Sequence, residues 1–188
     1  MTATVPSTDF SALTGTYTLD PAHSRFGFVA RHAMVTKVRG AFNDVEGTAT
    51  IDGANPANSG ASITIRTASV DTRNEQRDQH LRTNDFLDVE TYPTITFTST
   101  GVQHAGGNDF SVTGDLTIRG VTKPVTVPLE FQGAATDPFG NARIGFEGSL
   151  VINRKDWGVN WNAALEAGGV LVSEKVTLEF EISAVKQA

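Results

Sequence analysis

The sequence predicts an all-β protein, an extended up-and-down antiparallel β-barrel of about eight strands, and three features of the chain lead to this fold class. Apolar residues alternate with polar or small residues in segment after segment, which is the period of a half-buried strand. Turn-forming stretches such as DGANP, AGGND and DPFGN separate these segments. Short hairpin connections, as in GDLTIRGVTKPVTVPLEF, favour closure into a barrel, which leaves no exposed sheet edge.

The expected strands divide into two groups. In the first half of the chain they are residues 16–19, 25–33, 45–51, 62–70 and 94–102. In the second half the alternation is longer, and one face of each strand is apolar. These apolar sets are Phe110, Val112, Leu116 and Ile118; Val125, Val127, Leu129 and Phe131; Ile144, Phe146, Leu150 and Ile152; and Val176, Leu178, Phe180 and Ile182.

Residues 71–93 interrupt the strand pattern, because they are rich in charge and have no alternating apolar positions. Asn74 or Thr72 is suited to cap a short helix, and Asp85 to cap a second turn. A short helical insert is therefore expected near residues 74–90. We interpret it as a solvated connector in preference to a lid over the strand layer, since most long charged connections lie in solvent.

Length, composition and charge restrict the classes of function. The 188 residues are expected to form one domain, residues 16–188, after a polar N-terminal leader of residues 1–15. A net charge of −6 opposes binding to nucleic acid, and no apolar run approaches the length of a transmembrane segment. The N-terminus lacks the basic start and apolar stretch of a secretory signal, so a cytoplasmic location is expected.

The interior of such a barrel is either filled by side chains or able to hold one small ligand. Ala30, Gly114 and Gly148 lie in mid-strand on the inward face, between large apolar residues. Two interpretations follow from these positions. The small residues either keep an apolar tunnel open, or they mark bulges and bends of the strands.

Four stretches of the chain resemble successive signatures of the YceI-like family of polyisoprenoid-binding proteins: LDPAHSRFGFVARHAMVTKVRGAF, RDQHLRTNDFLDVETYPTITFTS, GDLTIRGVTKPVTVPLEF and RIGFEGSLVINRKDWGVNW. The resemblance covers about residues 16–185. It implies a lipocalin-like barrel, often a homodimer, whose tunnel holds a long-chain amphiphile such as a polyprenyl phosphate, an isoprenoid quinone or a fatty amide. It implies neither a defined reaction nor a cofactor, and the chain departs from many relatives in lacking a signal peptide.

The inward face and the resemblance together give a set of candidate ligand-binding residues. His32 is expected at one end of the tunnel. Arg154 is expected to hold a phosphate head group, with two tryptophans beside it at the boundary with water. The alternative for these last residues is a surface charge and ordinary core. The full set is Phe26, Phe28, Ala30, His32, Phe97, Val112, Gly114, Leu116, Ile118, Phe146, Gly148, Leu150, Arg154, Trp157, Trp161 and Phe180.

Other chemistry is not indicated. DPAHS, residues 20–24, gathers an acid, a histidine and a serine, but closeness in sequence is not a catalytic triad, and no G-x-S-x-G motif is present. The four histidines lack metal-ligand spacing, so neither a catalytic nor a metal-binding residue is predicted. The expected function is non-enzymatic binding and carriage or storage of an isoprenoid or similar lipid. The alternatives are an enzyme acting on such a lipid, with His32 or Arg154 in its site, and a self-filled barrel that serves as an interaction module.

Overall fold

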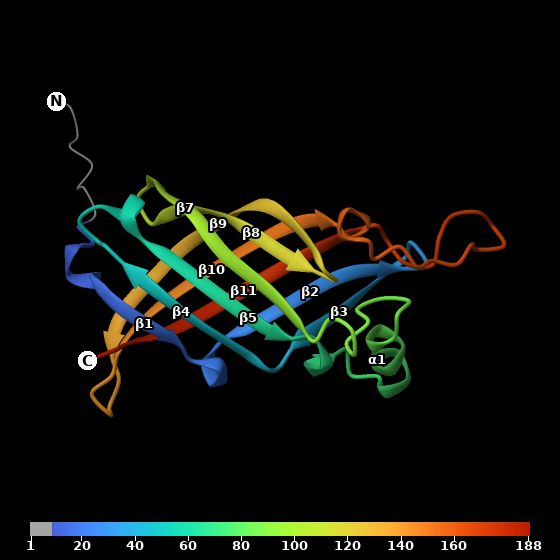
Figure 1. Ribbon diagram of the computed structural model, residues 1–188, viewed down its shortest axis with the longest axis horizontal. Coiled ribbons are helices and arrows are strands. Elements are labelled where there is room, and N and C mark those ends of the chain that lie inside the picture. The colour runs from blue at the N-terminus through green and yellow to red at the C-terminus, as the bar shows by residue number, and fades with distance from the viewer. Residues whose placement is uncertain (1–8) are drawn as a thin grey trace.

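The structure, a computed structural model, describes residues 9–188 and shows an elongated barrel with one short helix at its side (Figure 1). Within these residues, antiparallel strands form one sheet in the order β1-β4-β5-β7-β8-β9-β10-β11-β2-β3-β6, and an additional pairing of β1 with β11 closes it. The strands are β1 (Gly15–Leu19), β2 (Arg25–His32), β3 (Thr36–Phe42), β4 (Val45–Ile51), β5 (Gly60–Arg66), β6 (Val70–Asp71), β7 (Thr94–Gly106), β8 (Asp109–Ile118), β9 (Val121–Thr136), β10 (Ala142–Asn153) and β11 (Lys175–Lys186).

The first six strands behave as three broken ones. Strands β1 and β2 follow each other along the same edge of β11, since Leu19 pairs with Ala184 and Arg25 pairs with Glu181. The 3-10 turn η2 (Pro21–His23) separates them. The next aligned pair is β4 and β3, of which β4 pairs with β1 and β3 pairs with β2. The third is β5 and β6, of which β5 pairs with β4 and β6 pairs with β3. We call each of these aligned pairs of strands, and each of the long strands β7 to β11, a stave of the barrel. The barrel then has eight staves in up-and-down order, which confirms the predicted fold class.

Two short strands were not predicted. Strand β3 (Thr36–Phe42) alternates only over Val38, Gly40 and Phe42, and its central inward residue has no side chain to signal burial. Strand β6 has two residues. The prediction of one strand over residues 62–70 is wrong in its second part, because the chain turns at η4 (Thr67–Ser69) before β6.

The helical insert is confirmed as α1 (Glu75–Arg82). Its cap is Asn74 and not Thr72, because the Asn74 side-chain oxygen accepts the Arg77 N–H at 2.9 Å. Turns do follow the helix within residues 83–92, but Asp85 does not cap one, since its carboxylate lies 2.8 Å from the His80 ring nitrogen.

The interpretation of this segment as a solvated connector is wrong for its apolar residues. Phe86 is buried in a cluster at one end of the barrel, where it packs with residues of β7, β8 and β10 and with the segment after β10. The insert therefore helps to close that end. The members of this cluster, called the closed-end cluster below, are Phe86, Ile95, Leu116, Ile118, Ile152, Trp157 and Val159.

The opposite end of the barrel is covered by residues that were expected in the N-terminal leader. Phe10 is only 5% exposed, and its ring centroid lies 5.1 Å from that of Phe110 and 5.6 Å from that of Phe131. Residues 9–14 thus pack against the barrel, and the rest of the expected leader lies outside the described residues. The longest helix described has eight residues, and none found in this part of the chain is long and apolar enough to cross a membrane.

Candidate functional site in the barrel interior

An apolar cavity of about 250 Å³ occupies the interior of the barrel. It extends from Phe10 and Phe131 at the N-terminal end to Ile118 and Leu150, which adjoin the closed-end cluster. Its walls come from β1 to β5 and from β7 to β11, with Phe42 as the contribution of β3. A concave site with predominantly apolar walls is typical of proteins that bind small apolar ligands.

The lining of this interior cavity offers little acid–base chemistry. Within residues 9–188 its ionisable side chains are Asp52 and Tyr17. Asp52 accepts hydrogen bonds from the Asn55 N–H at 2.9 Å and the Asn58 amide at 3.1 Å, which lower the pKa of its carboxyl group. The Tyr17 hydroxyl donates to the Leu13 carbonyl at 2.8 Å, and burial raises its pKa. Both polar groups are therefore engaged within the protein.

Small side chains on the inward face explain why the interior is not filled. Ala49 of β4, Ala61 of β5 and Ala184 of β11 line the cavity, and so does Gly47 of β4, although the Ile63 side chain covers it. The bore of an eight-stranded barrel is filled only where inward side chains are large. The sequence prediction did not single out these positions, although the alternation of VEGTATI, residues 45–51, contains the signal for Gly47 and Ala49.

Half of the candidate ligand-binding residues lie at this cavity. They come from β2, β7, β8, β10 and β11, and all are large apolar residues on inward positions. They are Phe26, Phe97, Val112, Leu116, Ile118, Phe146, Leu150 and Phe180.

The small residues expected to keep the tunnel open do not line it. A Cβ atom on Gly114 would lie 2.5 Å from both the Phe97 ring and the Thr98 carbonyl oxygen. A Cβ atom on Gly148 would overlap the Pro128 carbonyl oxygen. These glycines permit close approach of neighbouring strands, and Gly114 lies opposite an irregularity in β7. Ala30 pairs with Val38 of β3, away from the cavity.

The other two candidates of β2 also lie away from the cavity. The Phe28 ring covers Gly40 on β3, and its centroid lies 5.6 Å from that of Phe42. His32 is exposed at the end of β2, where its backbone forms an isolated bridge with Val172. The alternation along β2 thus predicted the side correctly for Phe26, but the cavity does not extend along the whole strand.

Arg154 does not reach the cavity. The residue is buried, with only 6% of its surface exposed. Its guanidinium donates hydrogen bonds to the carbonyls of Val159 at 2.7 Å, Ser173 at 2.8 Å and Val172 at 3.3 Å. Burial lowers its pKa below the usual value for arginine. Arg154 therefore fastens the segment between β10 and β11, and its donors are not directed at a head group.

The two tryptophans belong to the core, as the alternative interpretation held. Trp157 is buried, and its indole N–H donates to the Leu116 carbonyl at 3.0 Å. The Trp161 ring centroid lies 4.7 Å from that of His80 and 5.2 Å from that of Phe86. Together they stabilise the closed end behind the cavity and do not form part of its lining.

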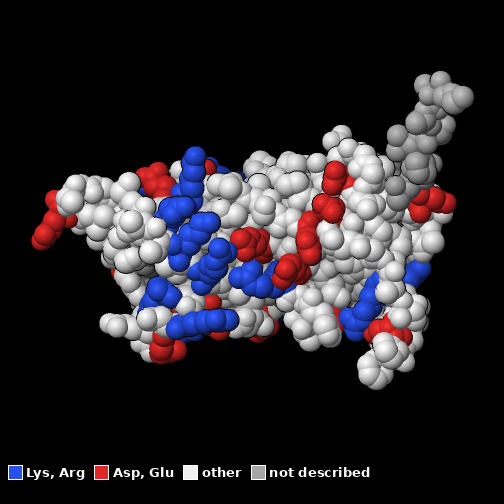
Figure 2. Space-filling model, turned by 180° about the vertical axis from the view of Figure 1, so that it is seen from behind, with Lys and Arg blue, Asp and Glu red and all other residues white. Residues whose placement is uncertain are grey.

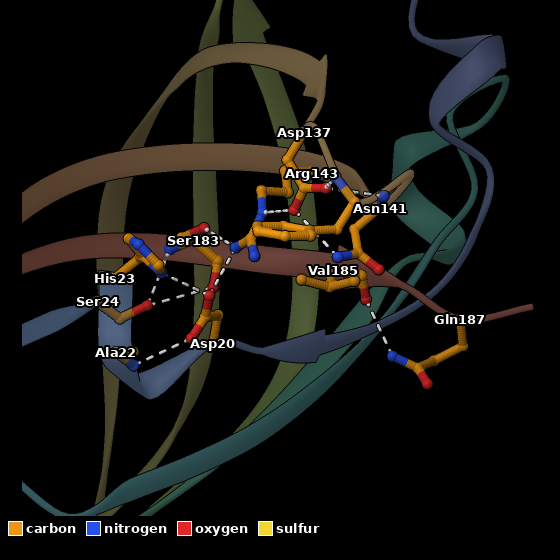
Figure 3. A network of polar contacts seen from close by, with 11 residues as sticks. Asp20, Ala22, His23, Ser24, Asp137, Asn141, Arg143, Ser183, Val185 and Gln187 are labelled. Atoms are coloured by element: carbon orange, nitrogen blue, oxygen red, sulfur yellow. Dashed lines mark hydrogen bonds and ion pairs between the residues drawn. The ribbon is translucent and has the colours of Figure 1, made fainter.

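The residues of DPAHS do not assemble a nucleophile and base. Asp20 contacts His23 at 2.7 Å, but Ser24 exchanges hydrogen bonds with the backbone of Ser183 (Figure 3). The Asp20 carboxylate is also paired with Arg143. In the described part of the chain, no group of three or more His, Cys, Asp or Glu side chains is placed to hold a metal ion.

The fold and the site define the class of the protein: a lipocalin-like closed β-barrel that encloses an apolar cavity of a kind suited to small ligands.

The chain belongs to the YceI-like family, whose YceI-like domain matches residues 17–184. Protein YceI of Escherichia coli is 40% identical over 179 residues, which cover 94% of this chain and 90% of that protein. A UPF0312 protein of Pseudomonas paraeruginosa is 39% identical over 178 residues, with the same coverage of both chains.

Solved structures show the same fold. BcnA of Burkholderia cenocepacia superposes with a TM-score of 0.78 at 30% identity, over 88% of this chain and 98% of that one. A polyisoprenoid binding domain from Saccharophagus degradans superposes with a TM-score of 0.68 at 18% identity, over 91% of this chain and 98% of that domain.

Proposed function

We propose that this protein binds a long-chain amphiphile, an isoprenoid or similar lipid, in its interior cavity and carries or stores it without changing it chemically. The observation that carries the proposal is the apolar cavity that runs between the two ends of the barrel. Membership of the YceI-like family and the likeness to a polyisoprenoid binding domain support an isoprenoid ligand such as a polyprenyl phosphate or a quinone. The eight large apolar residues from the candidate set that line the cavity are the proposed tail contacts.

The proposal of a non-enzymatic role is supported by the chemistry of the lining. Catalysis of proton transfer needs an ionisable group that is free to reach the substrate. Asp52 and Tyr17, the ionisable lining residues of the described chain, are engaged in hydrogen bonds with other parts of the protein. His32 and Arg154, the residues of the enzymatic alternative, lie outside the lining.

Apolar contact alone gives modest affinity. Drug-sized ligands gain roughly 0.3 kcal/mol per heavy atom, so a twenty-carbon tail contributes about 6 kcal/mol, which corresponds to tens of micromolar. Tight binding of a lipid in this barrel therefore needs either a longer tail or a site for the head group.

The decisive experiment examines what the protein contains. Native mass spectrometry of freshly purified protein, followed by organic extraction, is expected to show a long-chain lipid bound to the barrel. Protein that carries no lipid and also fails to take up added geranylgeraniol would overturn the proposal and favour an interaction module. Chemical turnover of the extracted lipid would favour an enzyme. The homodimer that the resemblance implies remains a prediction, which light scattering tests.

A substitution that fills the cavity provides the matching functional test. Ala49→Phe places a ring in the interior at a position where a small side chain lines the cavity. We expect it to weaken the binding of geranylgeraniol at least tenfold, measured by calorimetry, because the ring occupies the space of the tail. Thr98→Phe is the control, since Thr98 is exposed on the outer face of β7. Equal binding by Ala49→Phe and the wild type would contradict the proposed site.

A further inference from the structure

The wall of the barrel is interrupted on one side, where β1 gives way to β2 and β4 to β3. Backbone pairing of β1 with β4 ends at Thr18 and Thr48, and pairing of β2 with β3 begins at Phe26 and Phe42. Between these pairs the two staves are not joined by a ladder. We call this interruption the wall gap.

A second, smaller cavity of about 80 Å³ lies in the wall gap. Phe26 and Phe42 line both this cavity and the interior cavity. These two rings are therefore the partition between the wall gap and the interior of the barrel. The full lining of the small cavity is Pro21, Ser24, Arg25, Phe26, Ala41, Phe42, Asn43 and Val45.

Arg25 is the basic residue of this lining. A Cβ atom on Gly27 would overlap the Arg25 guanidinium, so the guanidinium lies over Gly27 on the outer face of β2. Gly27 itself lines the interior cavity. A single residue without a side chain thus separates the positive charge of Arg25 from the apolar interior, which matches the boundary between head and tail of an amphiphile.

The present partners of Arg25 hold it weakly. Its guanidinium lies 3.3 Å from a carboxylate oxygen of Glu179 and 3.4 Å from the Gly40 carbonyl, and its side chain is 39% exposed. Exposed ion pairs of this kind contribute little to stability. Glu179 also lies 3.8 Å from Arg39, so it keeps a basic neighbour if Arg25 turns toward another anion.

The charges around the wall gap have both signs. Glu179 and Glu181 of β11 are the acidic residues beside Arg25, and Asp71 accepts a hydrogen bond from Asn43. Basic side chains gather on the half of the back face that is nearer the end carrying residues 158–174, and acidic ones continue beyond them (Figure 2). An anion at Arg25 would thus compete with Glu179, and this competition can be measured.

We propose that the wall gap is the head-group site: an anionic head, such as a phosphate, lies beside Arg25, and the tail passes between Phe26 and Phe42 into the interior cavity. This inference rests on the proposed function and adds the class of head group and the point of entry. Arg25 takes the role expected of Arg154, whose donors all go to backbone carbonyls.

The test compares two ligands that differ in the head group alone, geranylgeranyl monophosphate and geranylgeraniol. Arg25→Gln is expected to weaken binding of the monophosphate about tenfold, because a hydrogen-bonded ion pair is lost, and to leave geranylgeraniol unchanged. Arg39→Gln is the matched control, since it removes another partner of the same Glu179 but lies outside the small cavity. Glu179→Gln is expected to strengthen monophosphate binding about threefold by removing the competitor.

The outcomes separate the two proposals. A wild-type protein that binds neither ligand overturns the proposed function. A wild-type protein that binds both, with Arg25→Gln lowering both affinities equally or neither, overturns the head-group site while the proposed function stands. If Arg25→Gln fails to fold, as judged by circular dichroism, Arg25→Lys is used in its place. It keeps the charge but loses the paired donors, so a loss of about threefold for the monophosphate is expected, and no loss overturns the site.

The point of entry is tested by kinetics. Phe42→Ala removes one half of the partition and is expected to speed the release of geranylgeranyl monophosphate about fivefold in a stopped-flow displacement experiment. Phe10→Ala opens the N-terminal end of the barrel and is the control, with release expected to change less than twofold. Faster release from Phe10→Ala than from Phe42→Ala would overturn entry through the wall gap.

Discussion

The barrel wall has two unlike halves. In the continuous half, β7 to β11, each strand runs for 10 to 16 residues without interruption. In the broken half, β1 to β6, each strand has 2 to 8 residues, and three staves are divided by turns. Long ladders fix the register of a strand over many pairs, whereas a break lets the chain change direction and leaves part of the wall unpaired. The wall gap lies in the broken half for this reason.

A clasp of charged side chains joins the two halves near the wall gap. Arg143 of β10 lies 2.6 Å from Asp20 and 2.7 Å from Asp137, and Asp20 also accepts the Ala22 N–H at 3.0 Å (Figure 3). Asp20 thus caps η2, the turn that breaks the first stave. The clasp holds this turn against the continuous half at the point where backbone pairing is missing.

The largest difference between the halves is expected for a one-residue insertion. An alanine inserted after Thr113 of β8 turns every following side chain of the strand to the opposite face, and we expect no folded protein. An alanine inserted after Asn43, in the break between β3 and β4, lengthens a turn and is expected to cost about 1 kcal/mol of the free energy of unfolding. Circular dichroism shows whether each variant folds, and urea denaturation measures the loss of stability in a variant that does. Equal losses would show that the break does not isolate the register of its strands.

Close approach of strands in the continuous half gives the next largest effect. Gly148→Ala is expected to lower the free energy of unfolding by about 2 to 3 kcal/mol, because its Cβ atom would overlap the backbone of Pro128. Gly101→Ala in β7 is the control, since a Cβ atom there meets no atom within 4 Å, and a change within about 0.5 kcal/mol is expected. Similar values for the two variants would contradict the role of Gly148 in strand packing.

The sequence predicted the continuous half better than the broken half. Strands β8 to β11 carry apolar residues at regular alternate positions, so both their existence and their inward faces were predicted. Strand β3 has a glycine at the centre of its inward face, and β6 has two residues, so neither gives a periodic signal. The break between β1 and β2 was predicted, because residues 16–19 and 25–33 were expected as separate strands, but only the pairing partners reveal that both strands lie along β11.

The candidate ligand-binding residues also fall into a group that was predicted well, the large apolar residues, and a group that was not, the small residues and Arg154. Large apolar residues such as Phe97 and Phe146 were predicted as ligand contacts from the inward face and the resemblance together, and both line the cavity. A small residue is ambiguous, because a glycine that opens space and a glycine that admits a neighbouring strand look the same in sequence, and Gly148 is of the second kind. Arg154 shows that a side chain's role is hard to predict when its partners are distant in sequence, since Ser173 and Val172 lie 19 and 18 residues further along the chain. Nothing near Arg154 in sequence indicates them.

The smallest expected effect concerns the clasp and appears only as a dependence on pH. The Arg143 guanidinium holds the pKa values of Asp137 and Asp20 below the ordinary aspartate value. Carboxyl groups whose pKa is lower in the folded state stabilise it above about pH 4, and this contribution is lost as the pH falls through the lowered pKa. Arg143→Gln is therefore expected to lower the Tm at pH 7, with a smaller difference from the wild type at pH 2.5. Arg66→Gln, which removes an exposed ion pair with Glu46 in the broken half, is expected to change the Tm little at either pH. A Tm difference for Arg143→Gln that stays constant between pH 7 and pH 2.5 would show that the clasp acts through packing and not through charge.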